Sequence, residues 1–259
     1  MRTYLVTGAA SGIGKATREL LEQRGHRVIG ADLRGTEIEC DLSSPAGRKA
    51  LVDQARDSSG GRLDAVIAVA GMVQPVPTTV AVNYFGMVST LEGLRPLLEG
   101  SPAPRAVGVS STNSLQPDDP LLVQLMLAGK EGAALERAAE LQDDPKRAHM
   151  IYSSSKQAFS RWVRRSAPRQ DWAGRSIPLN ATAPGVVETP MSSAFLSTEE
   201  GRQRAFAATP TPLNGPMSKP ISQAWALAWL ASEENTHLCG QILFVDGGFD
   251  AITRADSVW

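Results

Sequence analysis

A glycine-rich turn between an apolar strand and a helix is the feature that most constrains this chain. Residues 2–6 form a strand-like run, and the stretch 7–14 carries glycine at positions 8, 12 and 14 before a helical run over 15–24. Glycine lets a backbone approach a phosphate closely, and a helix N-terminus offers free N–H groups and a favourable dipole. The turn therefore predicts a phosphate-binding loop, with a tight strand–helix turn that binds nothing as the simpler alternative.

The second strand-like run, over residues 27–31, ends at Asp32. A carboxylate at this place accepts hydrogen bonds from the hydroxyls of an adenosine ribose and repels a 2′-phosphate. Arg34 stands two residues further on, and an arginine there can hold a 2′-phosphate. Because the carboxylate ends the strand itself, NAD is the expected cofactor and NADP the less favoured one.

Strand-like and helical runs alternate along the rest of the chain. This alternation is typical of an α/β fold: a single-domain, Rossmann-type, doubly wound parallel sheet with helices on both faces. Ligands of such folds bind at the carboxyl ends of the strands, so we expect Asp41 and Leu42 to flank an adenine and Gly71 to allow close backbone approach. The expected strands cover residues 37–40, 63–69, 106–109, 177–182 and 241–245, and the expected helices cover 45–56, 82–98 and 222–231.

The composition excludes several classes of function. The 259 residues, 42% of them hydrophobic, are enough for one large domain over residues 1–259 with a substantial core. A formal net charge of −1 indicates no surface for nucleic acid or for a membrane. The chain shows no signal-peptide pattern and no apolar run of about 18 residues, so we expect a cytoplasmic protein.

The cysteine and histidine residues are few and scattered. Cys40 and Cys239 lie far apart, and we expect two buried, reduced thiols rather than a disulfide or a metal site. His26, His149 and His237 do not show the spacing of a metal site, and we expect a structural or surface role for His149. No metal is therefore expected.

Tyr152 and Lys156 are four residues apart, the spacing that places two side chains on one face of a helix. An ammonium beside a phenol stabilises the phenolate and lowers the phenol pKa from about 10 towards neutrality. A tyrosine tuned in this way can exchange a proton with an alcohol oxygen near pH 7. Taken alone, the pair also fits a half-buried ring beside a solvated charge.

Two further polar residues are candidates for the site. Asn83 opens the helical run over 82–98, where it fits a satisfied core amide or a helix kink as well as a functional role. Ser111 follows the strand over 106–109. A hydroxyl there can bond a substrate oxygen, although a serine at a strand end is more often a cap or turn residue.

Taken in order, these motifs resemble those of the short-chain dehydrogenase/reductase family over nearly the whole chain. The residues that carry the resemblance are Thr7, Gly8, Gly12, Gly14, Asp32, Asp41, Ala70, Gly71, Asn83, Ser111, Tyr152, Lys156, Pro184, Gly185 and Thr189. One departure is Ala68-Val69-Ala70-Gly71, where the family usually has Asn-Asn-Ala-Gly, so side-chain amides that brace the site are lost. The other is the 41-residue spacing from Ser111 to Tyr152, where about a dozen residues are usual.

That long spacing narrows the resemblance. Residues 116–149 form an expected helical insertion, with an apolar run over 120–127 and an amphipathic run over 130–141. The insertion and the segments 47–49, 82–86 and 246–251 look like the bacterial 3α-hydroxysteroid dehydrogenase/carbonyl reductase branch of the family. This resemblance implies NAD(P)-dependent oxidation of a secondary alcohol and reduction of the matching ketone.

The resemblance also implies a role for each matching residue. Tyr152 is the general acid/base, and Lys156 lowers its pKa and bonds the nicotinamide ribose. Ser111 holds the substrate oxygen, and Asn83 holds a water that links Lys156 to solvent. The expected cofactor contacts are Gly8, Ser11, Gly12, Ile13, Gly14, Asp32, Asp41, Leu42, Ala70, Gly71, Tyr152, Lys156, Pro184, Gly185, Val187 and Thr189.

The C-terminal third bears on substrate and assembly. Residues 190–217 mix apolar side chains with Thr-Pro repeats, which favours a mobile lid over a small apolar alcohol or ketone, with an ordinary helix and loop as the alternative. Trp225 and Trp229 are expected to pack in the core. The insertion crowds the face that family members often use to assemble, so we expect a homo-oligomer, a dimer rather than a tetramer.

Three functions fit the sequence. The first is an NAD-dependent hydroxysteroid dehydrogenase or carbonyl reductase, and the second is a dehydrogenase of a smaller alicyclic or terpenoid alcohol. The third is a cofactor-sensing protein without catalysis. Such proteins typically lose the Tyr–Lys pair or the serine, and this chain keeps Ser111, Tyr152 and Lys156, so the third function ranks below the others.

Overall fold

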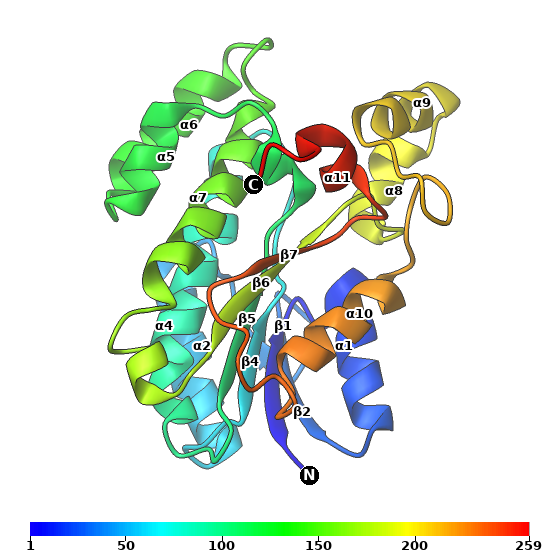
Figure 1. Cartoon of the computed structure of the whole chain (residues 1–259). Coiled ribbons are helices and arrows are strands. Elements are labelled where there is room, and N and C mark those ends of the chain that lie inside the picture. Colours follow the sequence, from blue (N-terminus) through cyan, green and yellow to red (C-terminus); the bar gives the residue numbers. More distant parts are fainter. Residues whose placement is uncertain (259) are drawn as a thin grey trace.

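The computed structural model of the chain describes residues 1–258, apart from the side chains of residues 194 and 195. A parallel sheet of seven strands runs through the middle, in the order β3-β2-β1-β4-β5-β6-β7 (Figure 1). The strands are β1 Thr3–Thr7, β2 Arg27–Asp32, β3 Ile38–Glu39, β4 Ala65–Ala68, β5 Arg105–Val109, β6 Leu179–Pro184 and β7 Ile242–Val245. β1 lies between β2 and β4, so the chain reverses its direction across the sheet there, and such switch points bind ligands.

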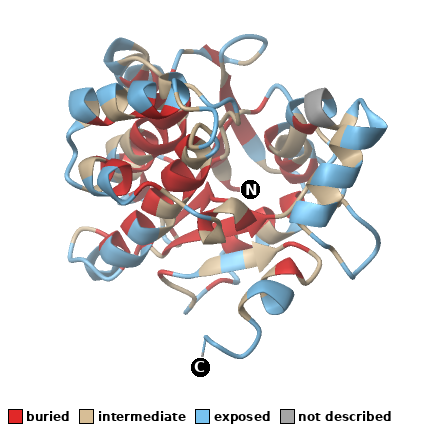
Figure 2. Ribbon diagram, turned by 90° about the horizontal axis from the view of Figure 1, so that it is seen from above, coloured by how far each residue is buried: buried red, intermediate tan, exposed pale blue. Residues whose placement is uncertain are grey.

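Helices cover both faces of the sheet, which confirms the doubly wound fold. α1 and α10 lie on one face, and α2, α4 and α7 lie on the other (Figure 1). The helices are α1 Gly12–Gln23, α2 Pro45–Ser59, α3 Pro77–Val80, α4 Met87–Leu98, α5 Pro120–Leu127, α6 Glu131–Gln142, α7 Met150–Ser166, α8 Pro190–Leu196, α9 Glu199–Ala208, α10 Pro220–Leu230 and α11 Phe249–Arg254, with short helical turns η1 Ala81–Gly86, η2 Thr112–Leu115 and η3 Ala173–Arg175. Two apolar core clusters fill the layers, and Figure 2 shows the buried residues gathered between the exposed outer helix faces.

The predicted strands are all present, and their ends differ by up to two residues. β3 is shorter than predicted because only Ile38 and Glu39 pair with β2 at this edge of the sheet. The helix predicted over 82–98 begins earlier, at Pro77, and passes through the π-helical turn η1 before α4. Within residues 1–258, no helix is both long and apolar enough to cross a membrane.

The segment predicted to be helical before Tyr152 folds into α5 and α6, which pack against α7 and α3. Asp119 anchors this segment because its buried carboxylate caps α5 and accepts hydrogen bonds from Arg137 and Arg147. Burial raises the pKa of the Asp119 carboxyl. The hydrogen bonds from the Arg137 guanidinium and the Leu122 amide lower this pKa by more, so the net pKa is lowered. The helices are thus held to the protein by buried charge pairing as well as by apolar packing.

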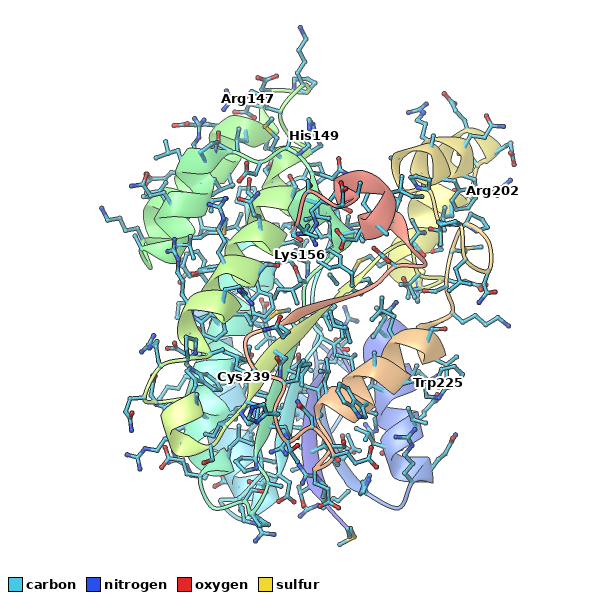
Figure 3. The ribbon with its side chains drawn as sticks, in the orientation of Figure 1. Arg147, His149, Lys156, Arg202, Trp225 and Cys239 are labelled. Atoms are coloured by element: carbon cyan, nitrogen blue, oxygen red, sulfur yellow. The ribbon has the colours of Figure 1, made fainter. Side chains whose placement is uncertain are left out.

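The prediction that Trp225 and Trp229 pack in the core is wrong. Trp225 is 55% exposed and Trp229 is 42% exposed, because α10 turns Ala224, Leu227 and Ala228 inward instead (Figure 3). The spacing of i and i+4 places two side chains on one helix face without saying which face meets the core.

The prediction of buried thiols is also wrong in part. Cys40 and Cys239 are free but only partly buried. Burial raises the pKa of Cys40 to about 11, so its thiol stays protonated near neutral pH. His149 is exposed, as expected for a surface residue.

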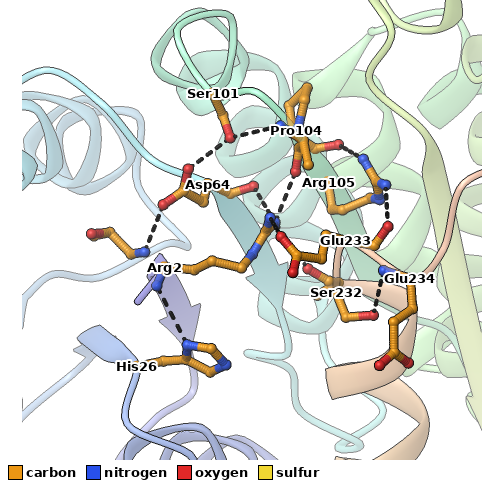
Figure 4. Close-up of polar contacts among 12 residues, drawn as sticks. Arg2, His26, Asp64, Ser101, Pro104, Arg105, Ser232, Glu233 and Glu234 are labelled. Atoms are coloured by element: carbon orange, nitrogen blue, oxygen red, sulfur yellow. Dashed lines mark hydrogen bonds and ion pairs between the residues drawn. The ribbon is translucent and has the colours of Figure 1, made fainter.

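A buried polar cluster ties the amino ends of the strands together (Figure 4). Arg2 donates hydrogen bonds to the backbone oxygens of Asp64, Ala103 and Ala231. The Asp64 carboxylate accepts hydrogen bonds from the Thr3 amide at 2.8 Å and the Ser101 hydroxyl at 2.7 Å. The cluster closes the end of the sheet opposite to the carboxyl ends, so it serves stability.

We predict that Asp64→Ala lowers the free energy of unfolding by about 1–3 kcal/mol, since buried donors lose their acceptor. Burial raises the pKa of Asp64, but the Ser101 hydroxyl, the Thr3 amide and Arg2 lower it more, so the net pKa is lowered. This stability is therefore present above the ordinary pKa of about 3.9 and is lost as the pH falls through the lower native value. Urea unfolding of the wild type and the variant at pH 7 measures the loss of stability. The same measurement at successively lower pH shows how that loss depends on pH.

The matched control is Asp57→Ala, because Asp57 is exposed at the end of α2. We expect a change within about 0.5 kcal/mol for it. Equal losses in the two variants, or a loss in Asp64→Ala that grows in acid, would contradict the role given to the cluster.

Candidate active site

A cavity of about 870 Å³ opens at the carboxyl ends of the strands. It brings together every predicted site residue except Asn83: Gly8, Ser11, Gly12, Ile13, Gly14, Asp32, Asp41, Leu42, Ala70, Gly71, Ser111, Tyr152, Lys156, Pro184, Gly185, Val187 and Thr189. These residues come from seven separate stretches of the chain. Their meeting in one cavity follows from the parallel sheet, whose strands all end on the same side.

The glycine-rich turn forms one wall of the cavity. Gly8 and Gly12 have φ angles of 68° and 52°, which favour glycine. A Cβ added to Gly14 would lie 2.1 Å from the Gly8 carbonyl oxygen, so α1 packs directly on the turn. Only glycine at position 14 fits this contact, and the N-terminus of α1 therefore lies against the cavity.

The ends of β1 and β4 are joined through Thr7. Its buried hydroxyl oxygen accepts hydrogen bonds from the Val69 and Ala70 amides, at 3.0 and 3.1 Å. A Cβ on Gly8 would lie 3.0 Å from the Ala70 nitrogen. Although this chain lacks the family's usual amide side chains there, the backbone of residues 69–71 still lines the cavity.

Asp32 stands at the end of β2, with its carboxylate held in place by backbone donors. The Ala10 amide donates to it at 3.0 Å and the Leu33 amide at 2.7 Å. A carboxylate has about four acceptor positions, so capacity remains for the hydroxyls of a ligand. Arg34 is exposed, and the nearby Arg18 is already paired with Glu22 and Glu37.

Tyr152 and Lys156 lie on α7 with Ser111 opposite them at the end of β5. The Lys156 ammonium lies 5.9 Å from the centre of the Tyr152 ring and donates a hydrogen bond to the Val109 carbonyl at 2.9 Å (Figure 3 labels Lys156). The Ser111 hydroxyl accepts from the Asn113 amide at 3.1 Å. Three of the four predicted catalytic residues are thus assembled at one place, between a strand end and a helix.

The acidities in this group differ from the expectation. Burial raises the pKa of Tyr152, and the hydrogen bond with Ser111 lowers it by less, so the net pKa is raised rather than lowered. Burial lowers the pKa of Lys156 to about 8. The phenol pKa rises because the buried ring loses hydration while the lysine donates to Val109, an arrangement that the sequence spacing cannot reveal.

Asn83 does not line the cavity. Its side chain is fully engaged in the π-helical turn η1, where it accepts from the Met72 amide and donates to the Met72 carbonyl and the Ser155 hydroxyl. Asn83 is therefore a core amide with satisfied hydrogen bonds, and it lies where the helix is distorted, as the two structural alternatives for this residue predicted. A Cβ on Gly71 would lie 3.1 Å from the Asn83 side-chain oxygen, so Asn83 supports the cavity wall from behind.

Three consecutive serines between Tyr152 and Lys156 were not singled out by sequence reasoning. Ser153 donates to the Pro117 carbonyl at 2.6 Å, Ser154 accepts from the Asp119 amide at 2.9 Å, and Ser155 accepts from Asn83 at 3.2 Å. The signal was their run of small hydroxyl side chains between two candidate catalytic residues. They bind α7 to two other segments, the loop at residues 117–119 and the turn η1.

The far wall of the cavity comes from residues after β6. Val187 pairs with Ser218 in an isolated bridge, and Thr189 caps α8 in a capping box with Ser192. Thr189 also contacts the glycine turn, because a Cβ on Gly12 would lie 3.2 Å from its methyl group. The segment predicted as a lid therefore starts directly beside the glycine-rich turn.

One face of α9 completes this wall. Gly201, Arg204, Ala205 and Ala208 line the cavity at helical spacing. Arg204 pairs with Glu200 on the exposed side. Sequence reasoning missed this face because small residues at helical spacing give no chemical signal. The other lining residues that it missed include Cys40, Met72, Val73, Asn113 and Met191.

Among the residues that the structure describes, no group of three or more His, Cys, Asp or Glu side chains is placed to hold a metal ion.

The sequence of this chain is similar to those of known protein families and known enzymes. The family profile described as short chain dehydrogenase matches residues 2–123, and the profile described as enoyl-(acyl carrier protein) reductase matches residues 122–250. A 3-alpha-hydroxysteroid dehydrogenase/carbonyl reductase from Comamonas testosteroni is 34% identical, with 98% of each chain covered. The chain belongs to the short-chain dehydrogenase/reductase family. It is an oxidoreductase of that family.

Two other similarities bear on fold and substrate. The crystal structure of the 3-alpha-hydroxysteroid dehydrogenase from Pseudomonas sp. B-0831 complexed with NADH is 39% identical, with a TM-score of 0.89 and 98% of this chain and 99% of that one covered. The cis-4-hydroxycyclohexanecarboxylate dehydrogenase of Sinomonas cyclohexanicum is 29% identical over 97% of both chains.

The residues of the cavity fit a nicotinamide dinucleotide. The turn at Gly8 and Gly14 leaves no room for side chains and lies at a helix N-terminus, as a pyrophosphate requires. Asp32 lies at the end of β2 with acceptor capacity left over. The cavity then continues to Tyr152 and Lys156, so one elongated ligand can reach both ends.

We predict that Gly14→Ala weakens NADH binding at least about tenfold. The added Cβ would overlap the Gly8 carbonyl, and overpacking of this kind costs about 1–3 kcal/mol. Fluorescence titration with NADH measures the dissociation constant. Gly132→Ala on α6 is the control, since no atom lies within 4 Å of its added Cβ. Unchanged affinity in Gly14→Ala would contradict the close fit of α1 on the turn.

Proposed function

We propose that the protein is an NAD-dependent dehydrogenase that interconverts a secondary alcohol and a ketone. The observation that carries this proposal is the meeting of Tyr152, Ser111 and Lys156 in the same cavity as the glycine turn. A proton-exchanging phenol, an oxygen-orienting hydroxyl and a cation are the groups that alcohol oxidation needs around the reacting oxygen. NAD, when bound, supplies the hydride acceptor for this reaction.

In this proposal the substrate oxygen lies between the hydroxyls of Tyr152 and Ser111. Ser111 donates a hydrogen bond that orients this oxygen, and Tyr152 takes the alcohol proton in oxidation and returns it in reduction. Lys156 in its ammonium form favours the phenolate and holds the ribose hydroxyls near the reacting carbon. Asn83 keeps α7 and the loop after β4 in place through Ser155 and Met72.

The finer cofactor preference rests on Asp32. Its carboxylate ends β2 beside the cavity, and a 2′-phosphate placed there would meet a negative charge. The 39% identical Pseudomonas enzyme is a complex with NADH, which supports the same preference. We therefore propose NAD as the cofactor of this chain in preference to NADP.

The proposed substrate class is a bulky apolar ketone or alcohol of the 3α-hydroxysteroid type. Two relatives above 30% identity carry that activity in their names. Gly201, Ala205 and Ala208 give the cavity a wall of small side chains, and residues 190–217 form the proposed lid. A smaller alicyclic alcohol is the second candidate, favoured by the similarity to the cis-4-hydroxycyclohexanecarboxylate enzyme.

We predict that Tyr152→Phe lowers the rate of alcohol oxidation by about 10²–10⁴, because the proton acceptor is removed. NADH binding stays within about twofold, since the cofactor contacts of the glycine turn remain. Absorbance of reduced nicotinamide is followed with NAD and a panel of 3α-hydroxysteroids, cyclohexanols and terpenoid alcohols. NADH fluorescence is measured in parallel.

Turnover of steroids by the wild type supports the first substrate class, and turnover of cyclohexanols or terpenoids alone supports the second. Retained activity in Tyr152→Phe would refute the assignment of the acid/base. Cofactor binding by the wild type without turnover of any alcohol or ketone would favour a sensing protein instead.

A second prediction concerns Asp32→Asn. The substitution keeps one oxygen acceptor and removes the charge that opposes a 2′-phosphate. We expect the ratio of kcat/KM for NAD to that for NADP to fall at least about tenfold, as a loss of about 1.4 kcal/mol of discrimination gives. Initial rates with each cofactor measure the ratio, with Asp41→Asn as the control. An unchanged ratio would show that Asp32 does not determine the preference for NAD over NADP.

We also propose that the protein is a homodimer. α5 and α6 cover α7 and α3, while Trp225, Trp229 and Leu243 leave an exposed apolar face on α10 and β7. Exposed apolar patches of this kind often mark protein interfaces. Light scattering is expected to give about twice the 27.6 kDa of one chain, and the double variant Trp225→Ser with Trp229→Ser to give a monomer. A wild-type tetramer would contradict this assembly.

A further inference from the structure

Arg48, in the first turn of α2, is the most heavily engaged cation near the cavity. Its side chain is only 8% exposed. Its Nε donates to the Leu42 carbonyl at 2.8 Å, and its Nη2 donates to the carbonyls of Ser43 at 3.1 Å and Ala81 at 3.2 Å. The guanidinium also lies 5.9 Å from the centre of the Phe85 ring. Arg48 thus joins the loop after β3 to the π-helical turn η1.

The loop that Arg48 grips lines the cavity through Asp41, Leu42 and Ser43. The backbone of residues 41–43 packs closely against two glycines. A Cβ on Gly47 would lie 1.9 Å from the backbone carbonyl oxygen of Asp41, and a Cβ on Gly86 would lie 2.9 Å from the backbone carbonyl oxygen of Leu42. The position of this cavity wall is therefore set by contacts to its backbone, which stay the same whatever side chains the loop carries.

Glu131 supplies the counter-charge of Arg48 from another part of the chain. Both oxygens of its carboxylate accept from the guanidinium, at 2.8 and 2.6 Å. Glu131 is the first residue of α6, in the segment 116–149 that precedes Tyr152. A buried guanidinium that loses its carboxylate keeps an uncompensated charge. The hydrogen bonds by which Arg48 holds the loop at residues 41–43 therefore depend on α6.

We propose that Arg48 is a positioning residue for the adenosine half of the cofactor, and that α6 completes this half of the site by providing Glu131. The inference rests on the proposed function, since it takes the loop 41–43 as the adenine wall. The segment 116–149 then acts at both ends of the cavity. Its Asp119 binds α7 near Tyr152, and its Glu131 holds the wall on the opposite side.

The test uses the full-length protein and ADP-ribose, a probe that lacks the nicotinamide ring. The variants are Glu131→Gln, which removes the counter-charge, and Arg48→Lys, which keeps the charge but loses the fork of donors. Glu140→Gln is the matched control on the same helix, because Glu140 is 65% exposed and pairs with Arg137 rather than with Arg48. Calorimetry gives the dissociation constant of ADP-ribose, and steady-state kinetics with saturating NAD gives kcat.

We expect both variants to bind ADP-ribose and NAD about tenfold more weakly, with kcat at saturating NAD and the KM of the alcohol within about twofold of the wild type. A general structural defect would lower kcat as well, so this split separates positioning from unfolding. Unchanged affinity in both variants, or a fall in kcat with unchanged affinity, would overturn the inference. A wild type that binds neither ADP-ribose nor NADH would instead refute the proposed function.

A second measurement needs no variant. If Glu131 and the adenosine half of the site are linked, ADP-ribose binding stabilises the Arg48–Glu131 pair by the same free energy that the pair gives to binding. Hydrogen exchange of the amides of α6 is then expected to slow when the wild-type protein binds ADP-ribose. Exchange in α6 that does not change on binding would overturn the inference.

Discussion

The site depends above all on how α7 is held against the carboxyl ends of the sheet. Tyr152 can meet a substrate oxygen only if α7 keeps its distance from β5. That distance is fixed by hydrogen bonds from the residues beside it, since Ser153 and Ser154 bond the backbone of residues 117–119 and Lys156 bonds the Val109 carbonyl of β5. These groups are buried, so breaking any one of them leaves an unpaired donor or acceptor. The catalytic helix is therefore positioned by polar bonds that are costly to lose.

The opposite half of the cavity is built on close backbone packing. Gly14 lets α1 lie on the Gly8 carbonyl, and Thr7 joins the loops that follow β1 and β4. The loop at residues 41–43 is fixed in the same way, by Gly47 and by Arg48. Rigid backbone walls suit a cofactor that must present one ring face to the substrate.

Most residues that the sequence singled out line one cavity, because they are chemically distinctive and stand at the ends of predicted strands. Sequence reasoning failed where burial decides the outcome. The pKa of Tyr152 is raised, although its spacing from Lys156 indicated the reverse, because desolvation outweighs the bond with Ser111. Trp225 and Trp229 share a helix face as predicted, but that face is exposed. Ser153, Ser154 and Ser155 were not singled out, since serine is common and their partners lie far away in the chain.

By itself, the sequence determined the fold class, the glycine-rich turn between β1 and α1 and the choice of candidate catalytic residues. These follow from local patterns: the alternation of strands and helices, glycines that nothing else can replace, and the spacing of a tyrosine and a lysine. The tertiary structure alone decided which side chains are desolvated, which faces of α9 and α10 meet the cavity or the solvent, and which residue of α6 neutralises Arg48. The physical reason is that desolvation and charge pairing depend on neighbours in space, and residues such as Arg48 and Glu131 become neighbours only when the chain has folded.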